Sequence, residues 1–141
     1  MKSRYKKILV GIDGTKESDK AFYEAVEMAK DHEADLFIAW INTEMERNPA
    51  HKDMSDREQL IYDRKVSKKE AEAKNLGVRA VTPIVATGDP KKYLSKWLPK
   101  EHQIDLIILG ATAKKVIANL LVGSTAKYVV EYATCPVFVV K

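Results

Sequence analysis

Five apolar runs of strand length, separated by longer polar or amphipathic segments, constrain the fold of this chain more than any other feature. The runs occupy residues 8–12, 36–41, 78–86, 106–109 and 137–140. The first and fourth runs are continuously apolar rather than alternating, which is typical of strands covered on both faces. This β-α rhythm predicts a single domain over residues 1–141, an open, doubly wound α/β fold with a parallel sheet and helices on both faces.

Composition narrows the classes of function. The chain has 141 residues, of which 45% are hydrophobic, enough to fill one core. No apolar run reaches the roughly 20 residues that span a bilayer, so we expect no membrane association and a cytoplasmic location. The net charge is +4, but the basic residues are interleaved with 20 acidic ones. This distribution does not predict nucleic-acid binding.

Two helix signals lie in the first half of the chain. Thr15 or Ser18 can cap a first helix. Its apolar stripe is expected at Ala21, Phe22, Ala25, Val26 and Ala29. A second helix is expected over residues 53–75, with Gly77 as its stop. The narrow buried seam of this second helix is expected at Leu60, Ile61, Val66 and Ala71.

Two further helices are expected in the second half. Asp89 can cap a third helix and Pro90 suits its first turn, whereas Pro99 should end or kink it. The buried stripe of this helix is expected at Tyr93, Leu94, Trp97 and Leu98. The last helix should run from about Ser124 to Ala133. Both tryptophans, Trp40 and Trp97, are expected in the core.

Unusual residues follow two of the expected strands. Asp13, Gly14 and Thr15 come after the first strand, and Gly110 ends the fourth. Ligands of doubly wound sheets bind at the carboxyl ends of the strands where the strand order reverses. If these two strands are neighbours, the two strand ends converge on one cleft. Asp13 could then accept hydrogen bonds from ribose hydroxyls or hold a metal ion that is bound to phosphate.

The fourth strand also begins a pattern typical of a phosphate-binding loop. Gly110-x2-Ala113-x9-Gly123-Ser124-Thr125 runs from a buried strand to a helix start. Backbone N–H groups and the helix dipole can converge on an anion at such a place. The hydroxyls of Ser124 and Thr125, with Lys114 or Lys115, could add to this site.

Simpler interpretations stand beside each of these residues. Asp13 could be only a turn residue, Ser124 only a helix cap, and Lys114 and Lys115 only solvated lysines. The three histidines lie far apart, so no structural metal site is expected. The single cysteine, Cys135, is expected to be a buried structural thiol.

Sequence signals for an enzyme are missing. The chain has no G-x-x-x-x-G-K-[ST] loop, no nucleophile elbow and no H-E-x-x-H helix. We therefore expect no efficient catalysis and name no catalytic residue.

The chain resembles the universal stress protein family over essentially its whole length. The residues that carry the resemblance are the segment from Ile8 to Thr15, the Gly88-Asp89-Pro90 turn, the segment from Asp105 to Gly110, the Gly123-Ser124 pair and the segment from Cys135 to Val140. The resemblance implies a five-stranded parallel sheet of order 3-2-1-4-5. That order places the first and fourth strands side by side.

The resemblance also implies an adenine-nucleotide site, because ATP-binding members carry the pattern Gly-x2-Gly-x9-Gly-Ser/Thr. Gly110 would lie by the ribose with Asp13, Gly123 and Ser124 would bind phosphates, and Ile41 would pack on adenine. Two positions depart from the family. Ala113 stands where the second glycine is expected, and Trp40-Ile41 stands where His-Val is often found. Alanine is tolerable at position 113 only if its φ is negative.

These features lead to a functional hypothesis for the whole chain. It predicts a dimeric stress-response regulator or sensor that binds ATP, ADP or AMP, with Mg²⁺ held by the phosphates. The resemblance implies a homodimer through Val137–Val140, which would cover an otherwise exposed apolar sheet edge. Two alternatives stay open: an interaction module of the same fold that binds an unknown protein partner and no nucleotide, and a slow enzyme that hydrolyses ATP or transfers a nucleotidyl group.

Overall fold

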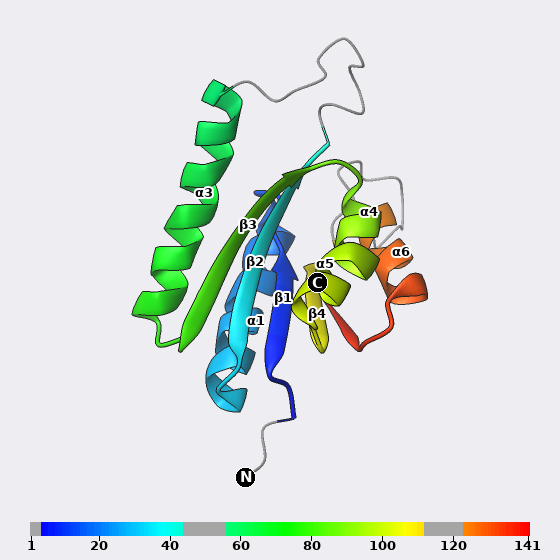
Figure 1. Ribbon diagram of the computed structural model, residues 1–141. Coiled ribbons are helices and arrows are strands. Elements are labelled where there is room, and N and C mark those ends of the chain that lie inside the picture. The colour runs from blue at the N-terminus through cyan, green and yellow to red at the C-terminus, as the bar shows by residue number, and fades with distance from the viewer. Residues whose placement is uncertain (1–3, 44–55, 112–122) are drawn as a thin grey trace.

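The computed structural model describes residues 4–43, 56–111 and 123–141. Its strands are β1 (Lys7–Gly11), β2 (Asp35–Asn42), β3 (Ala80–Thr87), β4 (Leu106–Gly110) and β5 (Val137–Val140). Its helices are α1 (Lys16–His32), α3 (Asp56–Asn75), α4 (Pro90–Lys92), the π-helix η1 (Tyr93–Trp97), α5 (Leu98–His102) and α6 (Ser124–Tyr132). The strands form one parallel sheet of order β3-β2-β1-β4-β5 (Figure 1), so the expected fold and strand order are confirmed.

Strand β1 is the centre of the sheet. Val10 pairs with Ile38 of β2 on one side and with Ile108 of β4 on the other. Ile8, Leu9 and Val10 have no exposed surface. The continuous apolar character of this run therefore reflects burial on both faces, as the sequence predicted.

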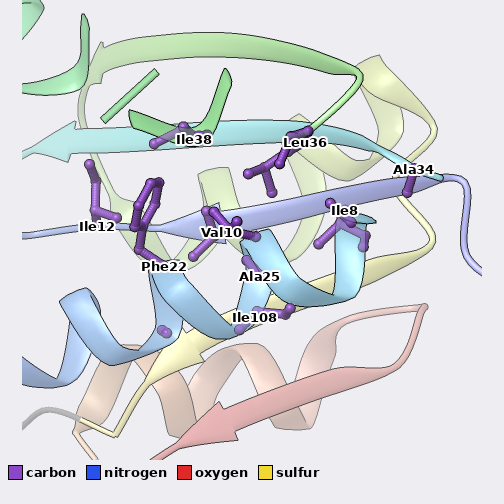
Figure 2. Close-up of a cluster of buried hydrophobic side chains, with 14 of the residues drawn as sticks. Ile8, Val10, Ile12, Phe22, Ala25, Ala34, Leu36, Ile38 and Ile108 are labelled. Carbon is purple, nitrogen blue, oxygen red and sulfur yellow. The ribbon is translucent and has the colours of Figure 1, made fainter. Parts of the chain in front are cut away.

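Alternate residues of the central strands supply two separate cores. On one face, Ile8, Val10 and Ile108 pack in a cluster with helices α1 and α3. On the other face, Leu9, Ile107 and their neighbours pack against η1, α5 and α6. Figure 2 shows the first cluster, in which Phe22 and Ala25 of α1 lie over the sheet. The chain is thus a three-layer α/β/α sandwich, because strand residues point alternately to opposite faces.

Helix α1 begins at one of the two caps that its sequence offers and ends at a residue in the left-handed conformation. Thr15 is its N-cap, and the Thr15 side chain accepts a hydrogen bond from the Ser18 N–H. At the other end, Glu33 adopts the left-handed conformation with φ of 52°. Its N–H donates to the carbonyl of Lys30, and the N–H of Ala34 donates to the carbonyl of Ala29. This is the Schellman arrangement, built here without glycine.

Helix α3 packs with a different seam from the one expected. Val66 and Ala73 are fully buried, whereas Leu60 and Ile61 are 48% and 46% exposed and Ala71 is also exposed. The prediction of a seam at Leu60, Ile61 and Ala71 was therefore wrong. With few apolar residues on this helix, the sequence leaves its rotation undetermined, and contact with β2 and β3 selects the face.

Polar contacts hold α3 against α1. Lys69 lies 3.2 Å from Asp19 and 3.7 Å from Glu72, and its ammonium stands over the ring of Phe22. The Tyr23 hydroxyl donates to Glu72, and this hydrogen bond raises the pKa of the tyrosine above its usual value. These contacts orient α3 more than they stabilise it, because exposed ion pairs contribute little.

The third helix differs from expectation at its middle. Pro99 does not end it: the chain widens into the π-helix η1, where the Leu98 N–H donates to the Tyr93 carbonyl, and then continues as α5 to His102. The wide turn accommodates Pro99, whose ring would clash with a carbonyl in a regular helix. The face also differs: Leu94, Ser95, Leu98 and Pro99 are buried. Trp97 is 44% exposed, so its expected place in the core was wrong.

Among the described helices, none combines the length and apolar character that crossing a membrane requires.

We expect Val66→Ala to lower the free energy of unfolding by about 2 kcal/mol, because it removes two buried methyl groups and leaves a cavity. Leu60→Ala should lower it by less than about 1 kcal/mol, because that side chain is half exposed. Urea denaturation followed by circular dichroism measures both. Equal losses in the two variants would contradict the seam described for α3.

Candidate functional site

The loop between β1 and α1 is closed by its own side chains. Asp13 Oδ1 accepts from the Thr15 N–H at 3.0 Å and from the Thr15 hydroxyl at 2.6 Å. The Asp13 N–H donates to the Ser18 hydroxyl at 3.2 Å. The turn-and-cap interpretation of Asp13 and Thr15 is therefore confirmed.

The turn role does not occupy the whole Asp13 side chain. Its carboxylate is exposed, and no hydrogen bond within the described part of the chain uses Oδ2. The same turn that occupies Oδ1 holds the carboxylate in a fixed orientation. Asp13 thus presents one oriented acceptor oxygen at the carboxyl end of β1.

Gly14 connects this loop to the end of β2. Its φ of +83° suits glycine, and a Cβ there would lie 3.3 Å from the ring of Trp40. Trp40 is half buried and contacts the ring of Tyr62 at 5.5 Å between centroids, with Lys65 above its face. The expected core role of Trp40 holds in part. No sequence signal showed its contact with the loop, because residues 14 and 40 meet only in the folded chain.

Gly110 is required by the approach of α1. A Cβ on Gly110 would stand 2.5 Å from the carbonyl carbon of Glu17 and 2.7 Å from the N of Ser18, both backbone atoms that cannot move aside. The first turn of α1 therefore lies directly on the end of β4. The sequence pattern explained Gly110 by ligand binding, but the close packing of α1 is by itself a sufficient reason for glycine at this position.

The start of α6 has glycine as its N-cap. Gly123 has φ of −68° and ψ of 162°, and within the described part of the chain no side-chain hydrogen bond caps this end. Because α6 begins at Ser124 with Gly123 as its N-cap, the interpretation of Ser124 as the helix cap was wrong. The N–H groups of the first turn have no intrahelical acceptors, and the helix dipole makes this end positive. The arrangement suits an anion.

The structure brings together some of the predicted site residues. Asp13, Gly14 and Thr15 meet Gly110 through the first turn of α1. Ile41 lies one strand away and packs, half buried, on the face that α6 covers. Thr125 is half buried in the first turn of α6. Ala113, Lys114 and Lys115 lie outside the described residues.

The described residues do not favour a metal site or a reactive thiol. Among the described residues, no group of three or more His, Cys, Asp or Glu side chains could hold a metal ion. Cys135 is half buried rather than buried, at the far end of α6. Burial, and then the charge of Asp105, raises the pKa of its thiol. A raised pKa lowers the fraction of thiolate and hence the reactivity of the thiol.

These features define the class of the protein: a doubly wound α/β domain whose candidate ligand edge lies at the β1–β4 switch point. The model of the universal stress protein family matches residues 4–141, and the chain belongs to that family.

Known relatives agree with this assignment. A Staphylococcus haemolyticus protein that carries the universal stress protein name is 31% identical over 142 residues, which cover 97% of this chain and 85% of the relative. The solved universal stress protein UspA from Lactobacillus plantarum is 28% identical, with a TM-score of 0.85 and coverage of 98% of this chain and 99% of that one.

More distant solved structures share the fold. A universal stress protein from Archaeoglobus fulgidus, solved in complex with dAMP, is 16% identical with a TM-score of 0.74, and the match covers 97% of this chain and 98% of that one. A universal stress protein solved in complex with cAMP is 24% identical with a TM-score of 0.73, and the match covers 97% of each chain.

We expect Gly110→Ala to lower the free energy of unfolding by about 3 kcal/mol, because the new methyl group overlaps the α1 backbone. Gly77→Ala is the matched control. It has room for a Cβ but a φ of +107°, so strain alone should cost about 1 kcal/mol. Urea denaturation measures both, and equal costs would contradict the close approach of α1 to β4.

Proposed function

We propose that this protein binds an adenine nucleotide at the carboxyl edge of the sheet, between the β1–α1 loop and the start of α6. The observation that carries the proposal is the start of α6, where no side chain of the described residues caps the helix and where Ala126 packs in the same core cluster as Leu109 of β4. Phosphate groups are the anions that such helix starts accommodate best. The relatives solved with cAMP and dAMP support an adenine nucleotide as the ligand class.

Each part of the nucleotide has a candidate partner in this arrangement. The first-turn N–H groups of α6, with the Ser124 and Thr125 hydroxyls, would bind phosphate oxygens. Asp13 Oδ2 would accept from a ribose hydroxyl, since its position is held by the Thr15 turn. Ile41 would pack against the base. Lys114 and the backbone at Ala113 belong to the same proposal.

We favour ATP with Mg²⁺ as the ligand and a regulatory or sensing role for the protein in the cytoplasm. Efficient phosphoryl transfer depends on positioned positive charge and an oriented nucleophile. The P-loop lysine that would supply such charge is missing from the sequence. The residues of the candidate site therefore suit nucleotide binding that changes the protein surface better than they suit nucleotide hydrolysis. A slow hydrolase is the alternative, and product analysis after long incubation with MgATP tests it.

We expect Asp13→Asn to weaken MgATP binding about tenfold, since a hydrogen bond to a charged acceptor contributes about 1.5 kcal/mol or more. Asparagine keeps the Oδ1 acceptor of the turn, so the melting temperature without nucleotide should hardly change. Isothermal titration calorimetry measures the affinity, and Asp31→Asn, an exposed change in the last turn of α1, is the control. Ala113→Gly should raise the affinity. Titrations without heat in all variants, and no thermal shift with MgATP, would refute the nucleotide site.

A homodimer through β5 is the second part of the proposal. The two edges of the sheet differ: β3 carries Pro83 and the exposed Thr82, whereas β5 consists of Val137, Phe138, Val139 and Val140. Phe138 is 44% exposed. Proline and polar groups discourage pairing at the β3 edge, but no such feature protects β5. Pairing with a second copy would cover this apolar edge.

We expect Phe138→Glu to convert the dimer to a monomer, because it places a charge in the proposed interface while leaving the core intact. Leu60→Glu is the matched control, since Leu60 is a similarly exposed apolar residue on α3. Sedimentation velocity measures the mass of each variant. A monomeric wild-type protein, or a Phe138→Glu variant that stays dimeric, would refute this interface.

A further inference from the structure

A groove of about 710 Å³ lies between the η1–α5 segment and α6, on the sheet face opposite α1 and α3. This volume is in the range of small-ligand and peptide-anchor sites. None of its lining residues belongs to the candidate nucleotide site. The groove therefore raises a question separate from nucleotide binding: what chemistry would occupy it?

The charge of the groove has one sign. Lys92, Lys96 and Lys100 line it, all three exposed, and no carboxylate is among its lining residues. Their four-residue spacing corresponds to about 6 Å between successive Cα atoms along the axis of a regular helix. An occupant therefore meets a row of positive charges on one wall, and this row favours an acidic partner.

The remaining walls are largely aromatic. Trp97 is 44% exposed and Tyr132 is 58% exposed, although large aromatic side chains gain free energy when they are buried. Tyr128 and Tyr132 pack against each other with ring centroids 4.5 Å apart and ring planes tilted by 40°, and both line the groove. Exposed aromatic side chains beside such a hollow are typical of the energetic centres of protein interfaces.

The floor offers a polar group as well. Ser95 lines the groove and is only 4% exposed. Its hydroxyl can donate a hydrogen bond to, or accept one from, an occupant that enters the groove.

We propose that this groove docks a short acidic segment of a partner protein, with an apolar or aromatic side chain between carboxylates. The carboxylates would meet the lysine row, and the apolar side chain would lie against Trp97 and the tyrosine pair. The distance from Lys92 to Lys100, about 12 Å along a helix, accommodates about four extended residues.

Two observations favour a peptide over single-stranded nucleic acid. Stacking of bases needs open aromatic faces. Here Tyr128 and Tyr132 pack against each other with their ring planes 40° apart, and Trp97 and Tyr93 form an edge-to-face pair with centroids 4.8 Å apart. The positive charge is also local, because the exposed Glu101 and Glu131 lie on the same two helices.

Fluorescence anisotropy with a fluorescein-labelled peptide of sequence DEDLFEDE tests the proposal on the full chain. We expect saturable binding that the double variant Lys96→Glu/Lys100→Glu weakens at least tenfold. The control is Lys20→Glu/Lys68→Glu, which reverses two exposed lysines on α1 and α3 and should leave the affinity unchanged. In a Trp40→Phe background, the emission of Trp97 should shift when unlabelled peptide binds.

Three control ligands distinguish the occupants. A peptide with serines in place of Leu-Phe tests the aromatic wall, a peptide with lysines in place of the acids tests the charge, and a single-stranded oligouridine tests nucleic acid. Weaker binding of both control peptides supports the proposal. Equal affinity of the two double variants, tighter binding of oligouridine through the same lysines, or a Lys96→Glu/Lys100→Glu variant that changes the oligomeric state in sedimentation velocity would overturn it.

Discussion

The complete burial of β1 is the constraint on which the rest of the structure depends. Ile8, Leu9 and Val10 lie between two neighbouring strands and between two layers of helices, so no side of this strand meets water. Only a parallel sheet with helices on both faces satisfies such a strand. Because β1 is central, the strand order must reverse beside it, and the loop that follows it opens at the switch point.

The same constraint explains why the candidate site is compact and why its residues have more than one role. Helix α1 must pack closely on the sheet, and Gly110 permits this by leaving room for the α1 backbone. Asp13 and Thr15 close the loop that starts α1 before any ligand is considered. Stability and the proposed ligand binding therefore depend on the same few residues. A substitution in this loop is expected to change both stability and binding. Asparagine at position 13 is different, because it keeps the turn and should change binding alone.

The two proposed binding regions lie in different parts of the molecule. The nucleotide edge is formed by loops at the carboxyl ends of the strands, whereas the acidic-peptide groove lies between helices on one face. Helix α6 belongs to both, with its N-terminus at the first and Tyr128 and Tyr132 at the second. If α6 had two positions and a ligand bound one of them more tightly, that ligand would couple the two regions, because coupling requires an element with two arrangements.

The sequence by itself determined the fold class, the five strands and the family, and it limited the cap of α1 to Thr15 or Ser18, because these follow from local periodicity and short motifs. Tertiary structure decided which faces are buried. Val66 rather than Leu60 anchors α3, and Trp97 is exposed beside the wide turn that accommodates Pro99. It also decided that Gly110 serves the packing of α1. Sequence patterns record the period of a helix but not its rotation against a sheet, and only contact between distant residues sets that rotation.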